Sequence, residues 1–211
     1  MMLGTKGVDG VPKLYPWDYH SDLTAARLVE IAKLLRQGRH DAVDRHDDTI
    51  GDDNWVLGVR AYNCGKFRVM QAHDSGNHSW LTIINPSLQF IFAIGHVPVR
   101  FYRGDADDPS EKTCRIAYPE LTQLAIAFQE EENDEMVFRF AVETYYDGSV
   151  DTIKFVGLRH KQAVLTWEIP LQLGEVVRFP LTVVAHDEGT ELAAPMVGLL
   201  VDDEGVANED G

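Results

Sequence analysis

Hydrophobic positions between residues 21 and 38 recur with the period of an α-helix. The apolar residues on this stripe are Leu23, Leu28, Ile31, Leu34 and Leu35. Ser21 and Asp22 are both suitable N-cap residues, and Gly38 suits the position just after a helix. The pattern therefore predicts an amphipathic helix that ends at Gly38, with a short helical continuation over 39–46.

From residue 55 onward the hydrophobic pattern changes to the two-residue period of β-strands. Apolar and polar positions alternate over 55–62 and again over 66–71, on either side of the turn sequence Asn63-Cys64-Gly65. Alternation around such a turn predicts a β-hairpin. Further strands are predicted over 80–84, 88–94 and 97–103. The nearly all-apolar tract 88–94 is typical of a central strand that is buried on both faces.

The second half of the chain shows the same two kinds of pattern. Pro119 suits the first turn of a helix, and apolar residues then recur at helical spacing over 119–129. Asp147-Gly148-Ser149 separates two alternating segments, which predicts another hairpin. The strands predicted in this half lie over 136–146, 153–158, 163–169, 176–185 and 196–201.

This order of elements predicts an α+β fold rather than the alternating βαβ units of a parallel sheet. We expect a largely antiparallel, curved sheet of about 8 to 10 strands, as one sheet or as two sub-sheets. The N-terminal amphipathic helix and the mid-chain helix should pack on it. The expected organisation is a flexible N-terminal arm over 1–20, a single domain over 21–201 and a disordered acidic tail over 202–211.

Charge is distributed unevenly along the chain. It holds 34 acidic and 19 basic side chains, for a net charge of −15, and Arg178 is the last basic residue. Only carboxylates carry charge after that position. This balance disfavours direct binding to nucleic acid or to an anionic membrane. A partner protein with a basic surface and an adaptation to solubility or high salt both remain open as explanations.

Several kinds of chemistry lack their sequence motifs here. The chain shows none of the short motifs of nucleotide-binding, zinc-protease or α/β-hydrolase sites. Two cysteines, Cys64 and Cys114, form neither a disulfide framework nor a four-thiolate metal site. We expect no signal peptide and no membrane span, since no uninterrupted apolar stretch reaches about 18 residues. The expected location is cytoplasmic.

One group of histidines and carboxylates is a candidate divalent-metal site. His73, Asp74 and His78 flank a predicted loop, and Asp105 begins an acidic loop that would complete the ligand set. Imidazole nitrogens and carboxylate oxygens are the ligand types that such a cation needs. The alternative interpretation is an exposed polar loop with two solvated histidines.

A second group of the same residue types lies in the first helical region. His40, Asp44 and Asp48 are four residues apart, which places them on one face if the helix continues. A metal site or a proton relay is one interpretation of this spacing. The alternative is an ordinary solvated helix face.

Arginine and tyrosine recur together at strand positions of equal parity. The pairs are Arg60 and Tyr62, Arg100 and Tyr102, and Arg139 and Tyr145. If these strand faces coincide, they form a platform on which guanidinium forks bind anionic groups and tyrosine rings add contact area. The alternative is ordinary cross-strand packing, in which each arginine pairs with a local carboxylate.

The leading functional hypothesis is a non-enzymatic binding or regulatory protein. It would engage another protein through the arginine–tyrosine face or through its acidic loops. The rival hypothesis is a metal-dependent hydrolase or nuclease that uses the histidine and aspartate cluster to activate water. A structural or oligomeric scaffold is a third. No cofactor is predicted apart from the divalent metal of the second hypothesis.

Overall fold

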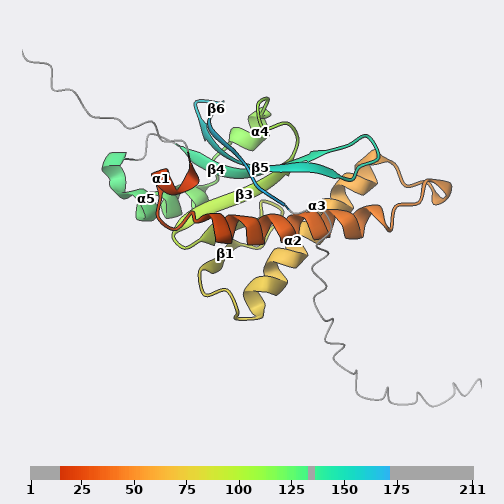
Figure 1. Cartoon of the computed structure of the whole chain (residues 1–211), viewed down its shortest axis with the longest axis horizontal. Coiled ribbons are helices and arrows are strands. Elements are labelled where there is room, and N and C mark those ends of the chain that lie inside the picture. The colour runs from red at the N-terminus through yellow and green to blue at the C-terminus, as the bar shows by residue number, and fades with distance from the viewer. Residues whose placement is uncertain (1–14, 133–135, 172–211) are drawn as a thin grey trace, which may run out of the picture. The chain divides into compact units, whose positions relative to one another are not determined.

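The protein, described by a computed structural model over residues 15–132 and 136–171, has an α+β fold with one six-stranded sheet (Figure 1). Its helices are α1 (Pro16–Tyr19), α2 (Ala25–Val43), α3 (Asn54–Asp74), α4 (Glu111–Cys114) and α5 (Tyr118–Glu132), with a 3-10 turn at Asp48–Ile50. Its strands are β1 (Leu81–Asn85), β2 (Ile91–Ile94), β3 (Val97–Arg103), β4 (Val137–Thr144), β5 (Val150–Arg159) and β6 (Gln162–Glu168).

The sheet is mostly antiparallel, which confirms the predicted class. Its strand order is β1-β2-β3-β4-β5-β6, and only β3 and β4 run parallel among the described strands. A parallel pair needs a long crossover, and α4 and α5 lie within it. The chain divides into two units, 1–177 and 178–211, and every described residue belongs to the first. The strands predicted over 176–185 and 196–201 and the predicted tail lie outside the described residues.

Helices α2 and α3 pack on one face of the sheet, over a core of phenylalanines. Phe138 stacks on Phe155 at 5.8 Å between ring centroids, and Phe140 meets Phe155 edge-on at 5.1 Å. Phe92 of β2 joins the cluster by stacking on Phe140. All four rings are fully buried. Offset and edge-on ring pairs add stability beyond the area they bury, so this cluster stabilises the middle of the sheet.

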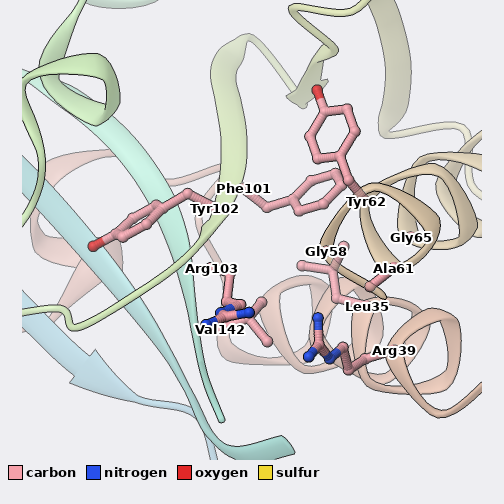
Figure 2. Close-up of a pocket in the computed structure, with 10 residues that line it drawn as sticks. All are labelled: Leu35, Arg39, Gly58, Ala61, Tyr62, Gly65, Phe101, Tyr102, Arg103 and Val142. Atoms are coloured by element: carbon pink, nitrogen blue, oxygen red, sulfur yellow. The ribbon is translucent and has the colours of Figure 1, made fainter. Parts of the chain in front are cut away.

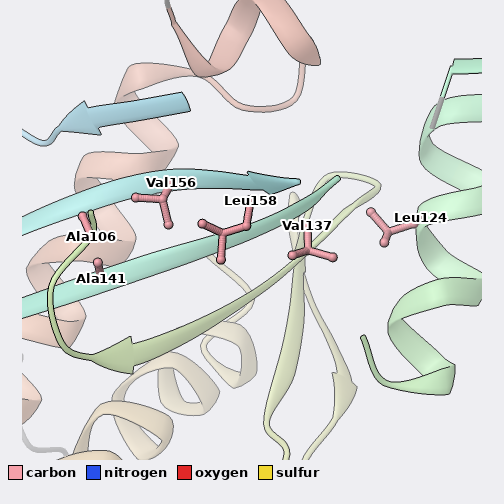
Figure 3. Packing of buried hydrophobic residues seen from close by; sticks show 6 residues of the cluster. All are labelled: Ala106, Leu124, Val137, Ala141, Val156 and Leu158. Carbon is pink, nitrogen blue, oxygen red and sulfur yellow. The ribbon is translucent and has the colours of Figure 1, made fainter. Parts of the chain in front are cut away.

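The opposite face is covered by α5 and by the segment that joins β3 to it. Its apolar cluster consists of Ala106, Leu124, Val137, Ala141, Val156 and Leu158. Figure 3 shows Leu124 extending from α5 towards Val137, at the start of β4. Each of these side chains is almost fully buried. The central strands are therefore covered on both faces, and neither face of β4 is free for a large partner.

The predicted N-terminal arm includes α1, whose aromatic residues contact the sheet. Tyr15 stacks on Trp17 at 4.9 Å, and Trp17 meets Trp167 of β6 edge-on at 5.3 Å. Tyr19 adds an edge-on contact with Phe138. These ring contacts hold residues 15–19 against the domain.

Two glycines let α2 and α3 touch. A Cβ atom added at Gly38 would lie 2.6 Å from the backbone nitrogen of Gly65, which is closer than real Cβ contacts. A Cβ at Gly65 would lie 3.3 Å from the ring of Phe101. The prediction of a helix end at Gly38 is therefore wrong, because this glycine serves a helix crossing. The predicted helical continuation over 39–46 is part of α2 as far as Val43.

The predicted hairpin over 55–71 is also wrong, since this segment is a single helix, α3. The side chain of Asp53 caps it by accepting a hydrogen bond from the backbone nitrogen of Val56, at 2.8 Å. The buried residues of α3 are Leu57, Ala61, Gly65, Val69 and Ala72. They recur every three or four residues, the period of a helix face. Gly65 lies at the helix crossing and not in a turn.

Replacing Gly38 with alanine should lower the free energy of unfolding by about 1–3 kcal/mol, because the new methyl group overpacks a backbone contact that cannot move aside. Gly58→Ala is the matched control. A Cβ there meets nothing within 4 Å, so alanine should raise stability by about 0.5–1 kcal/mol. Urea unfolding measures both variants, and a stable Gly38→Ala protein would contradict the close crossing.

Candidate functional site

The six arginines and tyrosines of the predicted platform do not share one surface. Arg60 and Tyr62 lie on helix α3, so the premise that they occupy a strand is wrong. Arg100, Tyr102 and Arg139 do share one face of the sheet, since Arg100 lies opposite Arg139 in the β3–β4 register. Tyr145 lies just beyond β4 and is 58% exposed. The structure therefore brings together three of the six residues.

The shared face is occupied by a buried ion pair. Arg139 is 1% exposed and Glu120 of α5 is fully buried. Arg139 donates hydrogen bonds to both carboxylate oxygens of Glu120 and to the backbone oxygens of Phe138, Thr113 and Arg115. Burial lowers the pKa of Arg139, and the charge of Glu120 opposes that shift. This guanidinium has no donor left for a ligand.

Most of the other platform residues also have partners inside the protein. Arg60 forms an ion pair of 2.8 Å with Asp52. The hydroxyl of Tyr62 donates to the backbone oxygen of Leu88 at 2.8 Å, and it accepts from the nitrogen of Phe90. Arg100 and Tyr102 donate to backbone oxygens of nearby loops. A binding role for these residues stays a prediction, and their contacts match the alternative of local pairing.

The first predicted metal cluster is not assembled. Nδ1 of His73 lies 2.9 Å from Asp74, while the ring of His78 packs edge-on against Trp80 at 5.3 Å. Asp105 lies in the loop after β3, where its side chain accepts from the nitrogen of Asp107. Over 15–132 and 136–171, no three histidine, cysteine or acidic side chains are arranged to hold a metal ion.

The second histidine and aspartate group separates into two pairs. Nε2 of His40 lies 3.4 Å from Asp44, one turn further along α2. Asp48 instead pairs with His46, at 2.8 Å. Each imidazole has its own carboxylate, so the spacing of four residues produces local pairs on the surface and not a shared site.

A carboxylate that the sequence did not single out for chemistry joins α2 to the sheet. Asp22 accepts hydrogen bonds from the backbone and the imidazole of His96, at 3.0 and 2.9 Å, and from Arg27 at 2.9 Å. Burial raises the pKa of Asp22, but these hydrogen bonds and the nearby His20 outweigh it and lower the pKa from 3.8 to about 2. The ionised form of Asp22 therefore stabilises the fold.

A cavity of about 270 Å³ lies between α2, α3 and the end of β3 (Figure 2). The residues that line it are Leu35, Arg39, Gly58, Ala61, Tyr62, Gly65, Phe101, Tyr102, Arg103 and Val142. Gly58, Ala61 and Gly65 form one small-residue stripe of α3, and a Cβ atom at Gly58 would meet nothing within 4 Å. The cavity exists because this stripe has no side chains large enough to fill it.

Two arginines lie at this cavity, and no carboxylate of the described residues pairs with either of them. Arg39 is 4% exposed, and its Nε donates to the backbone oxygen of Gly148 at 2.6 Å. Its Nη2 atom is buried and has no hydrogen-bond partner. Burial lowers the pKa of Arg39, and the positive charge of Arg103 lowers it further. Figure 2 shows both guanidiniums at the same end of the cavity, away from the ring of Tyr62.

Arg103 is exposed, and the residues described here place no carboxylate against it. A buried guanidinium with an unused donor is rare, since buried polar groups are almost always hydrogen-bonded. Arg39 and Arg103 are therefore the strongest candidate binding residues. Sequence reasoning missed both, because neither lies in a motif. Only the small-residue spacing of Gly58, Ala61 and Gly65, interpreted as helical, could have indicated a hollow beside them.

A second cavity, of about 310 Å³, lies on the other face of the sheet beside Cys114 and the turn that joins β5 to β6. Its Lys161 pairs with Glu111 at 2.7 Å. Burial raises the pKa of the Cys114 thiol, which disfavours the reactive thiolate. This cavity therefore shows neither an unpaired buried donor nor an activated nucleophile.

Comparison of the chain with protein-family models, with curated proteins and with solved structures finds no match. No helix in the described part of the chain is long and apolar enough to cross a membrane.

Asp22 makes stability depend on pH in a defined window. Its folded-state pKa is lower than its ordinary value, so its contribution is complete above about pH 4 and disappears as the pH falls towards 2. Asp22→Asn should remove this contribution, on the order of 1 kcal/mol after screening by solvent. The unfolding free energies of the two proteins should therefore differ at pH 5 and converge near pH 2. Asp108→Asn, at an exposed carboxylate, is the control and should show no such convergence.

Proposed function

We propose that the protein is a non-enzymatic binding or regulatory protein that takes an anionic group of its partner into the cavity between α2, α3 and β3. The observation that carries this proposal is the unpaired, buried Nη2 of Arg39 beside Arg103. An anion between the two guanidiniums would supply the missing hydrogen bond. It would also offset the positive charge of buried Arg39 and reduce its repulsion with Arg103.

Other arginines of the protein pair with carboxylates, whereas Arg39 and Arg103 have no carboxylate partner among the described residues. The chain carries 34 acidic side chains, and Arg60, Arg68 and Arg139 each pair with one of them. None of the described carboxylates pairs with Arg39 or Arg103. This pair therefore fits a group that comes from outside the described part of the chain. Since the net charge of −15 repels anions at long range, affinity has to arise from close contacts inside the cavity.

The lining of the cavity favours binding over catalysis. It contains no histidine, carboxylate, cysteine, serine or lysine, and the hydroxyls of its two tyrosines, Tyr62 and Tyr102, already donate to backbone oxygens. The rival hydrolase hypothesis depends on His73, His78 and Asp105, which contact other residues in the structure and not one another. A protein as the partner remains the expectation from the sequence. The cavity itself requires only a negative group, which an acidic side chain of a protein or the carboxylate of a small acid equally provides.

Acetate titrated at constant ionic strength should raise the thermal midpoint of the protein in a saturable way. A ligand at ten times its dissociation constant stabilises the native state by about 1.4 kcal/mol. Arg103→Gln should abolish this rise, because one of the two guanidiniums is lost. Arg115→Gln removes an exposed arginine outside this cavity with the same change in charge, and it should respond like the wild type. Equal responses of all three proteins would contradict the proposal.

A further inference from the structure

Building on the proposed function, we infer that the natural occupant of the cavity is a small amphipathic monocarboxylate. Its carboxylate lies between Arg39 and Arg103, and its hydrocarbon or aryl body lies against Phe101 and the small-residue stripe of α3. Four properties of the cavity carry this inference: its free donors, its volume, its charge and the kind of backbone that forms its walls.

The free hydrogen-bonding groups of the cavity are confined to one end. The hydroxyl of Tyr62 is already bound to the backbone of the β1–β2 connection, at Leu88 and Phe90. The ring of Tyr102 points away from the cavity, on the other side of β3 (Figure 2). Leu35, Ala61 and Val142 contribute hydrocarbon only. A ligand with a polar body would bury donors and acceptors without partners, so the body is apolar.

The walls also exclude an extended peptide as the main occupant. They are the sides of two helices and the face of two paired strands, β3 and β4, whose backbone groups are already hydrogen-bonded within those elements. A bound chain would find no free strand edge with which to pair. A carboxylate on a hydrocarbon body has no such requirement.

The volume sets the size of the ligand. A cavity of about 270 Å³ lies just below the range of about 300–1,000 Å³ that is usual for drug-sized ligands. At roughly 30 Å³ for each non-hydrogen atom, the volume of a water molecule in the liquid, it holds on the order of ten such atoms. A fatty acid of medium chain length or a small aryl acid has this size.

The charge of the site favours one negative charge over two. Removing a dianion from water into an apolar cavity costs more than removing a monoanion. The net charge of −15 also repels a dianion more strongly. A carboxylate has two oxygens in a plane, which match the planar fork of a guanidinium. These points favour a carboxylate over a phosphate monoester.

Gly58 provides the test, because a side chain there enters the cavity without touching the walls near Cβ. Octanoate and acetate are titrated against the wild type by calorimetry, well below the concentration at which octanoate forms micelles. Octanoate has about six methylenes more than acetate, and each one that is buried should raise affinity about fourfold, so burial of only half of them already makes octanoate about 60-fold tighter. Gly58→Leu should remove that advantage and leave the response to acetate. Gly58→Ala changes the helix but fills little of the cavity, so it should keep most of the advantage.

The controls separate this inference from the proposed function. Equal affinity for octanoate and acetate, both lost in Arg103→Gln, would overturn the amphipathic ligand and leave the anion site standing. No saturable binding of either acid would overturn both. Octyl phosphate that binds more tightly than octanoate would overturn the assignment to a carboxylate. Octanoate binding that survives both Gly58→Leu and Arg103→Gln would place it elsewhere on the protein and would also overturn the inference.

Discussion

The backbone contact between α2 and α3 at Gly38 and Gly65 determines how the rest of the helical layer meets the sheet. Only glycine allows the two backbones to come this close. Phe101 of β3 packs directly on Gly65, which closes one end of the small-residue stripe of α3. The stripe continues to Gly58, where nothing covers it, and the cavity opens there. Arg39 follows Gly38 immediately and is held at the edge of this hollow.

The two faces of the sheet use arginine in opposite ways. On the face covered by α5, Arg139 is enclosed with Glu120 and has every donor engaged, so it stabilises the crossover between β3 and β4. Removing one partner of such a buried pair lowers the stability of the fold. The intact pair has no free donor with which to bind a ligand. On the helical face, Arg39 shares its surroundings with Arg103, a like charge. In the first arrangement every donor is engaged within the protein, and in the second we propose that an anion supplies the missing partner.

The fold class and most strands could be predicted because their signals are local. The predicted strand over 97–103 matches β3, and Asp147-Gly148-Ser149 does turn the chain between β4 and β5. The strands predicted over 55–71 were wrong because the apolar residues of this segment fit both the two-residue period of a strand and the period of a helix. Trp55 and Val59 fit an alternating strand, yet in the helix they are exposed while Leu57 and Ala61 are buried. Which set becomes buried depends on α2, so the local pattern could not decide it.

The candidate site could not be predicted from the sequence for a related reason. Arg39 becomes a buried cation only because α2 continues through Gly38, a residue that also resembles a helix end. Arg103 lies at the end of a strand, where charged residues are ordinary. What distinguishes this pair is a relation in space, namely two guanidiniums near one cavity with no carboxylate beside them in the part of the chain that the structure describes. Many carboxylates are present in the chain, and no pattern along it shows which arginines they leave unpaired.

Side-chain NMR of the arginines, followed while acetate is added to saturation, tests the anion site most directly. The Nε–H signals of Arg39 and Arg103 should shift together along one saturable curve. The signal of Arg139 should stay unchanged, because its donors are already engaged by Glu120 and by backbone oxygens. Signals of Arg39 and Arg103 that do not move, or that move no more than those of Arg139 and the surface arginines, would contradict the account.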